Sequence, residues 1–385
     1  MTSARVSICA FLLLAVGCGG ESKVTVPVAA VTVNPGESIQ AAIDAAAPGD
    51  TIMVMPGDYT ETKEEGTPGA SAAIWVNKPL KLIAKSNPPD ARVRILRSSG
   101  QTDGIYVSPA NDNDPAIDGV EINGFTVEDF PNNGIWLRYV KNFTIENNES
   151  IRNLENGIWP TLSADGLVKK NVAYGSLDSA LWVEASQNVR VIDNDLHHSP
   201  TGLEITVSKE ITAEGNDVHD NTIGIGLYHP AGAGLPPLEP PSDNGYWHII
   251  DNHVHDNNLP NPAQGGQVAA LPPGGGILLT GVDNVDIRGN LIENNDFFGI
   301  AMLDHCTAVA GSDFNCVDNP PDFADTVPED NKFISNTLVS NGTNPPPGDF
   351  QAFAADILVL GGENNCASDN TASTTFPTPL GLPEC

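Results

Sequence analysis

The phrase FTIENN at Phe143–Asn148 returns as VKKN at Val168–Asn171, as VIDN at Val191–Asn194 and as ITAEGN at Ile211–Asn216. The four closing asparagines are separated by 23, 23 and 22 residues, and each is followed by Gly or Ala and an alternating apolar segment. A fixed period of this length is the signature of a solenoid, whose repeats bury their apolar sides against their neighbours. The phrase recurs, after longer gaps, at Asn252, Asn290 and Asn336.

The repeats indicate an all-β solenoid. Each holds short apolar runs with period-two alternation, separated by Asn, Asp, Gly and Ser, which is typical of strands and turns. We therefore predict a right-handed parallel β-helix with three-strand coils of about 22–23 residues. A stacked amide both donates and accepts, so the repeated asparagines are predicted to form a structural ladder along the coils.

The sequence predicts that the chain consists of three successive parts. Residues 1–17 have a basic residue followed by an apolar segment, as in a signal peptide, and Gly17 and Cys18 resemble a bacterial lipobox. Residues 18–37 would be a lipid-anchored tether. Residues 38–385 form a single β-helix domain that opens with a short amphipathic capping helix at Ser38–Ala47. Long Pro/Gly-rich loops are predicted at 229–245, 258–275, 305–330 and 342–350.

The lipobox predicts an outer-membrane or cell-surface lipoprotein of a Gram-negative bacterium, held to the membrane only through its lipid. We expect Cys18→Ser to abolish lipid attachment and to move the protein into the soluble fraction, because the acyl chains need the thiol. Fractionation after metabolic labelling with a fatty acid measures both effects. Equal membrane recovery of the variant and the wild type would contradict the lipobox.

Cysteines and charge limit the compartment and the partners. Beyond Cys9 and Cys18 four cysteines remain, an even number as in exported chains, and neighbour pairing is the simplest of three connectivities: Cys306–Cys316 and Cys366–Cys385. With 18 basic and 49 acidic residues, the formal charge of −31 argues against nucleic acid. Acidic polysaccharides would need a bound cation, so Ca is the cofactor to consider.

Two columns of outward side chains can carry chemistry. On the Gly-apolar-x-apolar strands the outward positions hold Trp136, Trp159, Trp182 and Glu204, and two places further on Arg138, Glu184 and Tyr228. An aromatic strip with polar borders suits sugar binding, unless a loop or the N-terminal segment covers it.

The second column follows the ladder asparagines by three residues and contains His197, His219 and His255, with Asp217 and Asp220 beside it. Such imidazoles act as a general base or hold a metal, which the sequence leaves unassigned. A solvated turn column is the alternative. In the catalytic interpretation His219 is the general base, Asp217 or Asp220 assists it, and activity rises through the His titration near about pH 6 to 7.

Several segments resemble a known group of proteins: Ser38–Glu61, Gly157–Pro160, Gly202–Ile205, Gly224–Pro230, Val254–Asn258 and Leu271–Ile277. The chain is similar to exported bacterial right-handed parallel β-helix (pectin-lyase-like) repeat proteins without established activity, over roughly two-thirds of its length. The resemblance implies the fold, whereas activity varies widely within that fold. Signature motifs of pectate lyases, polygalacturonases and alginate epimerases are missing.

These observations favour a cell-envelope lipoprotein whose β-helix binds and processes carbohydrate. If it is an enzyme, it would be a polysaccharide lyase, an epimerase or a glycosidase. Two alternatives remain. One is a non-catalytic envelope protein that binds a protein partner. The other is a Ca-dependent polyuronate lyase, which the scarcity of Arg and Lys opposes.

Overall fold

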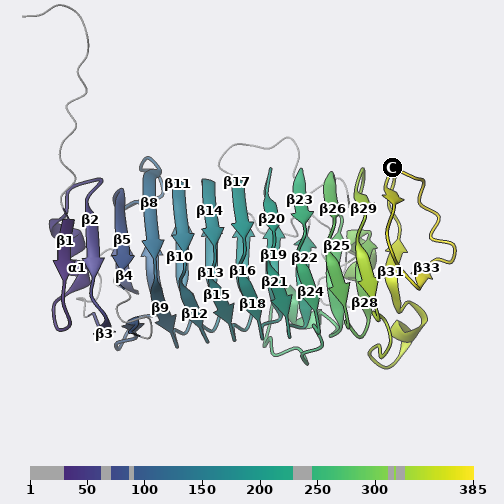
Figure 1. Cartoon of the computed structure of the whole chain (residues 1–385), viewed down its shortest axis with the longest axis horizontal. Helices are drawn as coiled ribbons and strands as arrows, with labels where there is room; N and C mark the ends of the chain where they lie inside the picture. The colour runs from purple at the N-terminus through teal and green to yellow at the C-terminus, as the bar shows by residue number, and fades with distance from the viewer. Residues whose placement is uncertain (1–29, 62–70, 86–90, 229–244, 311–315, 318–325) are drawn as a thin grey trace, which may run out of the picture.

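The computed structural model describes residues 30–61, 71–85, 91–228, 245–310, 316–317 and 326–385. Successive coils stack along one long axis, from β1 at one end to β33 at the other (Figure 1). Three parallel sheets run along this axis, and each coil contributes one strand to each sheet, as β10, β11 and β12 do. The predicted right-handed parallel β-helix is confirmed.

We name the three sheets A, B and C. Sheet A contains β1 (Ala30–Val33), β2 (Thr51–Val54), β5 (Leu80–Ala84), β8 (Ile117–Asn123), β11 (Val140–Glu146), β14 (Ala164–Lys169), β17 (Gln187–Ile192), β20 (Thr212–Glu214), β23 (Trp247–Ile250), β26 (Val285–Arg288), β29 (Lys332–Ile334) and β32 (Cys366–Ser368). Sheet B contains β3 (Gly57–Tyr59), β6 (Val93–Leu96), β9 (Phe125–Glu128), β12 (Glu149–Ile151), β15 (Val172–Tyr174), β18 (Asp195–His197), β21 (Asp217–His219), β24 (His253–His255), β27 (Leu291–Glu293) and β30 (Thr337–Val339). Sheet C contains β4 (Ala72–Val76), β7 (Asp103–Val107), β10 (Ile135–Arg138), β13 (Ile158–Thr161), β16 (Ser179–Glu184), β19 (Thr201–Thr206), β22 (Ile223–Tyr228), β25 (Gly275–Thr280), β28 (Phe298–Leu303), β31 (Ala355–Leu360) and β33 (Thr375–Phe376).

The inward side chains of all three sheets form one continuous core. In sheet C, Leu181, Leu203 and Ile225 pair in register and are fully buried. Because one face of each strand is inside, a slip of one residue would expose this whole apolar set. The register of the repeats is therefore set by their hydrophobic pattern.

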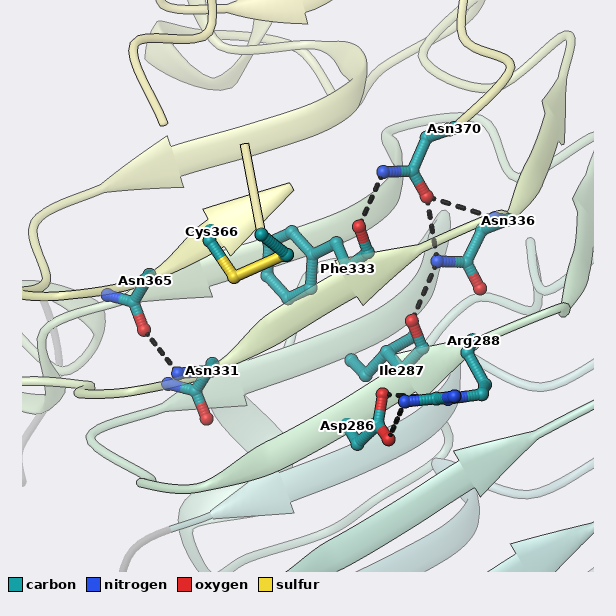
Figure 2. The surroundings of a disulfide bond; sticks show 10 residues. Asp286, Ile287, Arg288, Asn331, Phe333, Asn336, Asn365, Cys366 and Asn370 are labelled. Atoms are coloured by element: carbon teal, nitrogen blue, oxygen red, sulfur yellow. Dashed lines mark hydrogen bonds and ion pairs between the residues drawn. A yellow bond between two sulfur atoms is a disulfide. The ribbon is translucent and has the colours of Figure 1, made fainter. Parts of the chain in front are cut away.

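The predicted asparagine ladder lies between sheets A and B. Asn216 Oδ1 accepts from the backbone N–H and the side-chain amide of Asn194, at 3.0 and 2.9 Å. Asn216 Nδ2 donates to the carbonyl of Val191 and to Asn252 Oδ1, both at 2.9 Å. Figure 2 shows the last members, where Asn336 donates to Asn370. Each buried amide thus satisfies backbone groups of the neighbouring coils, as buried polar groups must be satisfied.

A second ladder, absent from the sequence-based interpretation, lies between sheets B and C. Asn221, Asn257 and Asn295 repeat the same contacts, with amide-to-amide distances of 3.0 and 3.1 Å. In each coil one residue with left-handed backbone conformation lies between the strand of sheet B and the asparagine of this ladder. After β18, β21 and β24 these residues are His198, Asp220 and Asp256, with φ of 55, 53 and 52°. Asp and His are among the residues that tolerate this conformation best, which explains part of their enrichment here.

The N-terminal cap is α1 (Ile39–Ala45), with Ser38 as its N-cap, as predicted. The β-helix begins earlier than predicted, because β1 pairs with β2 and makes Ala30–Val33 the first strand of sheet A. The boundary at residue 38 was therefore wrong. The predicted signal segment and Cys18 lie outside the described residues. No helix among the described residues is long and apolar enough to cross a membrane.

Both predicted disulfides, Cys306–Cys316 and Cys366–Cys385, are present. Cys366–Cys385 ties the C-terminus to β32, beside the end of the asparagine ladder (Figure 2). The predicted loops contain short helices at their described parts: η1 (Gln267–Ala270), α2 (His305–Ala308) and η2 (Asp349–Ala352). Most of the loop predicted at 229–245 lies outside the described residues.

Candidate functional site

The outer face of sheet C brings the predicted carbohydrate-contacting residues together. Register pairs Trp136 with Trp159 on neighbouring coils and Trp182 with Glu204, and Glu204 in turn with Gly226. Two residues further along the strands, Glu184 pairs with Thr206 and Thr206 with Tyr228. The two outward columns predicted from the repeat therefore lie side by side.

The aromatic strip consists of Tyr106, Trp136, Trp159 and Trp182. Their neighbouring ring centroids are 4.3, 5.0 and 5.1 Å apart, and the indole planes lie within 6° of each other. Each of these four residues is partly exposed. The N-terminal segment and most of the loop predicted at 229–245, which could cover the strip, lie outside the described residues. Since each inner face is occupied by the next ring, the outward edges and the terminal face of the stack are what it offers to a ligand.

The stack ends at Trp182, and the next position in its column is a carboxyl group. Glu204 is only 6% exposed, and its Oε2 accepts from Ser179 Oγ at 2.5 Å. On the preceding coil, Glu184 is also buried and accepts from Thr161 at 3.0 Å. Both carboxyls were predicted to be the polar border of an exposed aromatic strip, whereas the structure buries them beneath the molecular surface.

Tyr228 covers the gap that a glycine leaves beside Glu204. A Cβ at position 226 would collide with the ring and hydroxyl of Tyr228, so Gly226 gives this ring its place. The Tyr228 hydroxyl and Thr201 Oγ1 are both buried, and Thr201 is the side-chain hydrogen-bond partner of Tyr228. Buried hydroxyls are normally paired, and these two groups satisfy each other.

Acid groups around Glu204 hold their protons unusually well. Burial raises the pKa of Asp178 to about 6 and that of Glu184 to about 7. Burial raises the pKa of Glu204 well above its ordinary value, and the charges of Asp178 and Glu184 add to the shift. Burial likewise raises the pKa of Tyr228. Strongly shifted groups gathered in one place are typical of functional sites.

Asp178, Ser179 and Thr201 belong to this site, although the sequence analysis did not select them. Ser179 and Thr201 begin β16 and β19, and Asp178 stands directly before β16. They lie upstream of the Gly-apolar-x-apolar phrase on which the repeats were aligned. Extending the alignment by three residues toward the N-terminus would have revealed Asp178 in the repeat that precedes Glu204.

The histidine column lies on the outer face of sheet B, on β15, β18, β21 and β24, which follow one another along the molecule (Figure 1). Tyr174, His197, His219 and His255 stack with ring centroids 4.6, 4.9 and 5.1 Å apart. The predicted column is thus formed, on a different sheet from the aromatic strip.

His219 contacts Asp220, one of its two predicted partners, and in place of Asp217 it contacts Asp195. Its Nδ1 lies 2.8 Å from Asp220 and its Nε2 lies 3.1 Å from Asp195, whereas Asp217 contacts His255. Asp195, followed by Asp220, raises the pKa of His219 to about 9 despite partial burial. At neutral pH this imidazole is therefore protonated and cannot accept a proton. The prediction that His219 is a general base titrating near pH 6 to 7 is therefore wrong.

One part of the column has the geometry of a metal site. Ligand atoms of Asp217, His253 and His255 all lie within 4.8 Å of one another. Asp217 Oδ1 is 3.0 Å from His255 Nε2 and 3.5 Å from His253 Nδ1, and the two imidazole rings stack at 4.0 Å. Glu293 contacts His253 Nε2 at 3.0 Å. Two imidazoles and a carboxylate suit a divalent transition metal better than calcium, which prefers oxygen ligands.

The fold and these two faces define a parallel β-helix protein with an acid-rich aromatic face. Residues 44–270 match the family described as periplasmic copper-binding protein (NosD). The match covers more than half of the chain, which therefore belongs to the NosD family. No match was found among the curated proteins.

Solved structures confirm the architecture. The A-module of mannuronan C-5 epimerase AlgE4 from Azotobacter vinelandii superimposes with a TM-score of 0.58 and 16% identity, over 86% of this chain and 94% of that one. DFA-IIIase from Arthrobacter chlorophenolicus A6 gives a TM-score of 0.54 and 15% identity, over 86% of this chain and 77% of that one. At such identities the likeness concerns the fold.

Proposed function

We propose that this protein is an exported β-helix protein that binds carbohydrate on the outer face of sheet C. The observation that carries the proposal is the partly exposed stack of Trp136, Trp159 and Trp182, whose column continues at the buried carboxyl of Glu204. Sugars are recognised by apolar ring contacts combined with a few fixed polar groups. Two structural neighbours act on carbohydrates by their names, mannuronan C-5 epimerase and DFA-IIIase, which agrees with this proposal.

The ligand is expected to be a neutral or weakly charged glycan. Along the strands of sheet C that the structure describes, Arg138 is the single Lys or Arg, and it is paired with Asp112 at 2.7 Å. Recognition of a polyuronate would need cations against its carboxylates. The Ca-dependent lyase is therefore disfavoured.

Removing the terminal ring of the stack tests the binding proposal. We expect Trp182→Ala to weaken glycan binding at least about tenfold, because it removes the face beside Glu204 and the indole donor to Thr206. A glycan array finds the ligand, and titration calorimetry measures the loss. Tyr246→Ala is the control, since Tyr246 is 41% exposed beside sheet A. Trp247 is unsuitable as a control because it is fully buried. Equal weakening by both variants would contradict a site on sheet C.

A second candidate function is binding of a transition metal on sheet B. The family description names copper, and Asp217, His253 and His255 supply ligands that copper accepts. These residues would hold the ion through imidazole nitrogens and a carboxylate oxygen. Neutral imidazoles are required, so metal binding displaces protons and weakens at low pH.

The metal candidate predicts a loss of binding that is specific to these ligands. We expect His253→Ala combined with His255→Ala to reduce Cu²⁺ affinity at least about a hundredfold, since two of three ligands are lost. Calorimetric titration at neutral pH, repeated with Ca²⁺, measures the affinity and selectivity. The matched control is His248→Ala, an exposed histidine of sheet A that contacts Asp286. Unchanged Cu²⁺ affinity in the double variant would remove this candidate.

A further inference from the structure

We propose that Asp256 and Glu293 are positioning residues of a metal site on sheet B, and that each orients one of the two imidazoles that face Asp217. The proposal rests on the second candidate function above, the binding of a transition metal by Asp217, His253 and His255. It adds the two carboxylates that set the hydrogen position of each ligand ring.

The strand pattern places the two imidazoles on one face. His253 and His255 are two residues apart on β24, so both side chains leave the same face of sheet B. Register puts Asp217 of the preceding coil beside His253, and Glu293 of the following coil beside His255. On the two preceding coils the position of His253 is occupied by Asp195 and Asp217. The change from Asp to His at β24 therefore brings two imidazoles to one carboxylate.

Each imidazole lies between two carboxylates. On the inner side, Asp217 Oδ1 is 3.0 Å from His255 Nε2 and 3.5 Å from His253 Nδ1. On the outer side, His255 Nδ1 is 2.8 Å from Asp256 Oδ2, and His253 Nε2 is 3.0 Å from Glu293 Oε1. An ionised carboxylate only accepts hydrogen bonds, and a neutral imidazole has a single N–H. The shorter contact of each ring is the outer one, so the geometry assigns the hydrogens to the nitrogens that face Asp256 and Glu293.

This assignment directs the electron pairs of both rings to one place. With the outer nitrogens protonated, His253 Nδ1 and His255 Nε2 present lone pairs to the carboxylate of Asp217. Three electron-pair donors then converge with no hydrogen between them, an arrangement that a cation stabilises. Protonating both inner nitrogens would require two protons, whereas one divalent ion is shared by all three donors.

The outer contacts are those of ligands in metal sites. A histidine that binds a metal usually donates its other N–H to a carboxylate, which fixes the tautomer and makes the ligand nitrogen more basic. Here both ligand histidines have such a partner, and the partners come from different places. Asp256 directly follows His255 in a left-handed conformation, at φ 52°, whereas Glu293 belongs to the next coil. The site thus extends over β21, β24 and β27.

Replacing each outer carboxylate by its amide tests the proposal with Cu²⁺ as the probe. In Glu293→Gln the new amide can donate to His253 Nε2, which moves the ring hydrogen to Nδ1 and removes the lone pair that faces Asp217. We expect the affinity for Cu²⁺, measured by calorimetric titration of the purified protein, to fall about 10- to 100-fold. Electron paramagnetic resonance of the Cu²⁺ complex should show one coordinated imidazole where the wild type shows two. Asp256→Asn should act in the same way through His255.

Two controls separate orientation from a loss of charge. Asp286→Asn removes a carboxylate that lies 3.8 Å from His248 on sheet A, and it should leave Cu²⁺ affinity and spectrum unchanged. In a His253→Ala background, Glu293→Gln should have little further effect, because the ring through which it acts is missing. A loss caused by charge alone would be the same in both backgrounds.

The outcomes distinguish this proposal from the metal candidate on which it rests. If the wild type binds no more Cu²⁺ than the variant that lacks both His253 and His255, both are overturned. If the wild type binds Cu²⁺ and the two amide variants keep its affinity and both coordinated imidazoles, the positioning roles are overturned and the metal site stands. Additive losses without a change in the number of coordinated imidazoles also overturn the positioning roles. Circular dichroism checks folding, and should one amide variant be unfolded, the other decides.

Discussion

Asn216→Leu is expected to lower the free energy of unfolding by roughly 3 kcal/mol, measured by urea denaturation followed by circular dichroism. The wild-type amide makes four hydrogen bonds to Asn194, Val191 and Asn252. Leucine leaves the backbone N–H and the side-chain amide of Asn194 without the acceptor that they share, and each such buried group costs about 1–3 kcal/mol. The larger branched side chain also has to fit between two coils.

Two further variants make this prediction specific. Asn216→Asp keeps the accepting oxygen and loses the donor, so its stability should lie between those of the wild type and the leucine variant. Asn113→Leu changes an exposed asparagine in a loop and should have little effect. A wild-type denaturation midpoint for Asn216→Leu would show that the ladder contributes no net stability.

The second large effect is a loss of stability as the pH rises, caused by the carboxyls of sheet C. Glu184 has a folded-state pKa of about 7 against an ordinary value of 4.5. Between these values the unfolded chain has released its proton and the folded chain has not. The free energy of unfolding therefore falls with rising pH in this window, by about 3 kcal/mol for a shift of this size. Glu204 acts in the same direction.

Glu184→Gln isolates this contribution. We expect the fall in unfolding free energy between pH 4.5 and pH 8 to be smaller in the variant by about 3 kcal/mol, because glutamine does not titrate. Chemical denaturation at a series of pH values measures the difference. Glu210→Gln, which removes an exposed carboxyl, is the control. His219, with its raised pKa, also loses stabilisation as the pH rises toward 9, and it does so equally in both proteins. If the free energy of unfolding depends on pH in the same way in the wild type and in Glu184→Gln, Glu184 does not have a raised pKa in the folded protein.

The repeat was enough to predict the fold because a solenoid is built from local contacts between neighbouring coils. The spacing of Asn148, Asn171 and Asn194 equals the length of one coil, so sequence period and structural period coincide. The same period placed Trp136, Trp159 and Trp182 in one column. The start of the β-helix was misplaced because Ala30–Val33 precedes the regular repeat and pairs only with β2.

The sequence by itself therefore determined the architecture and the two outward columns, since both follow from periodicity. Neighbour pairing of the cysteines was only the simplest of three connectivities, and the tertiary structure selected it. Burial and proton affinity were decided only by the tertiary structure. Glu204 and Glu184 differ from surface carboxyls because neighbouring coils withdraw them from water, and desolvation then favours the neutral acid. The same packing gives His219 two aspartate neighbours, so it is held as a cation and excluded as a base. The repeat pattern predicts which side chains are neighbours, whereas their burial and their charged neighbours in the folded chain decide which of them are protonated.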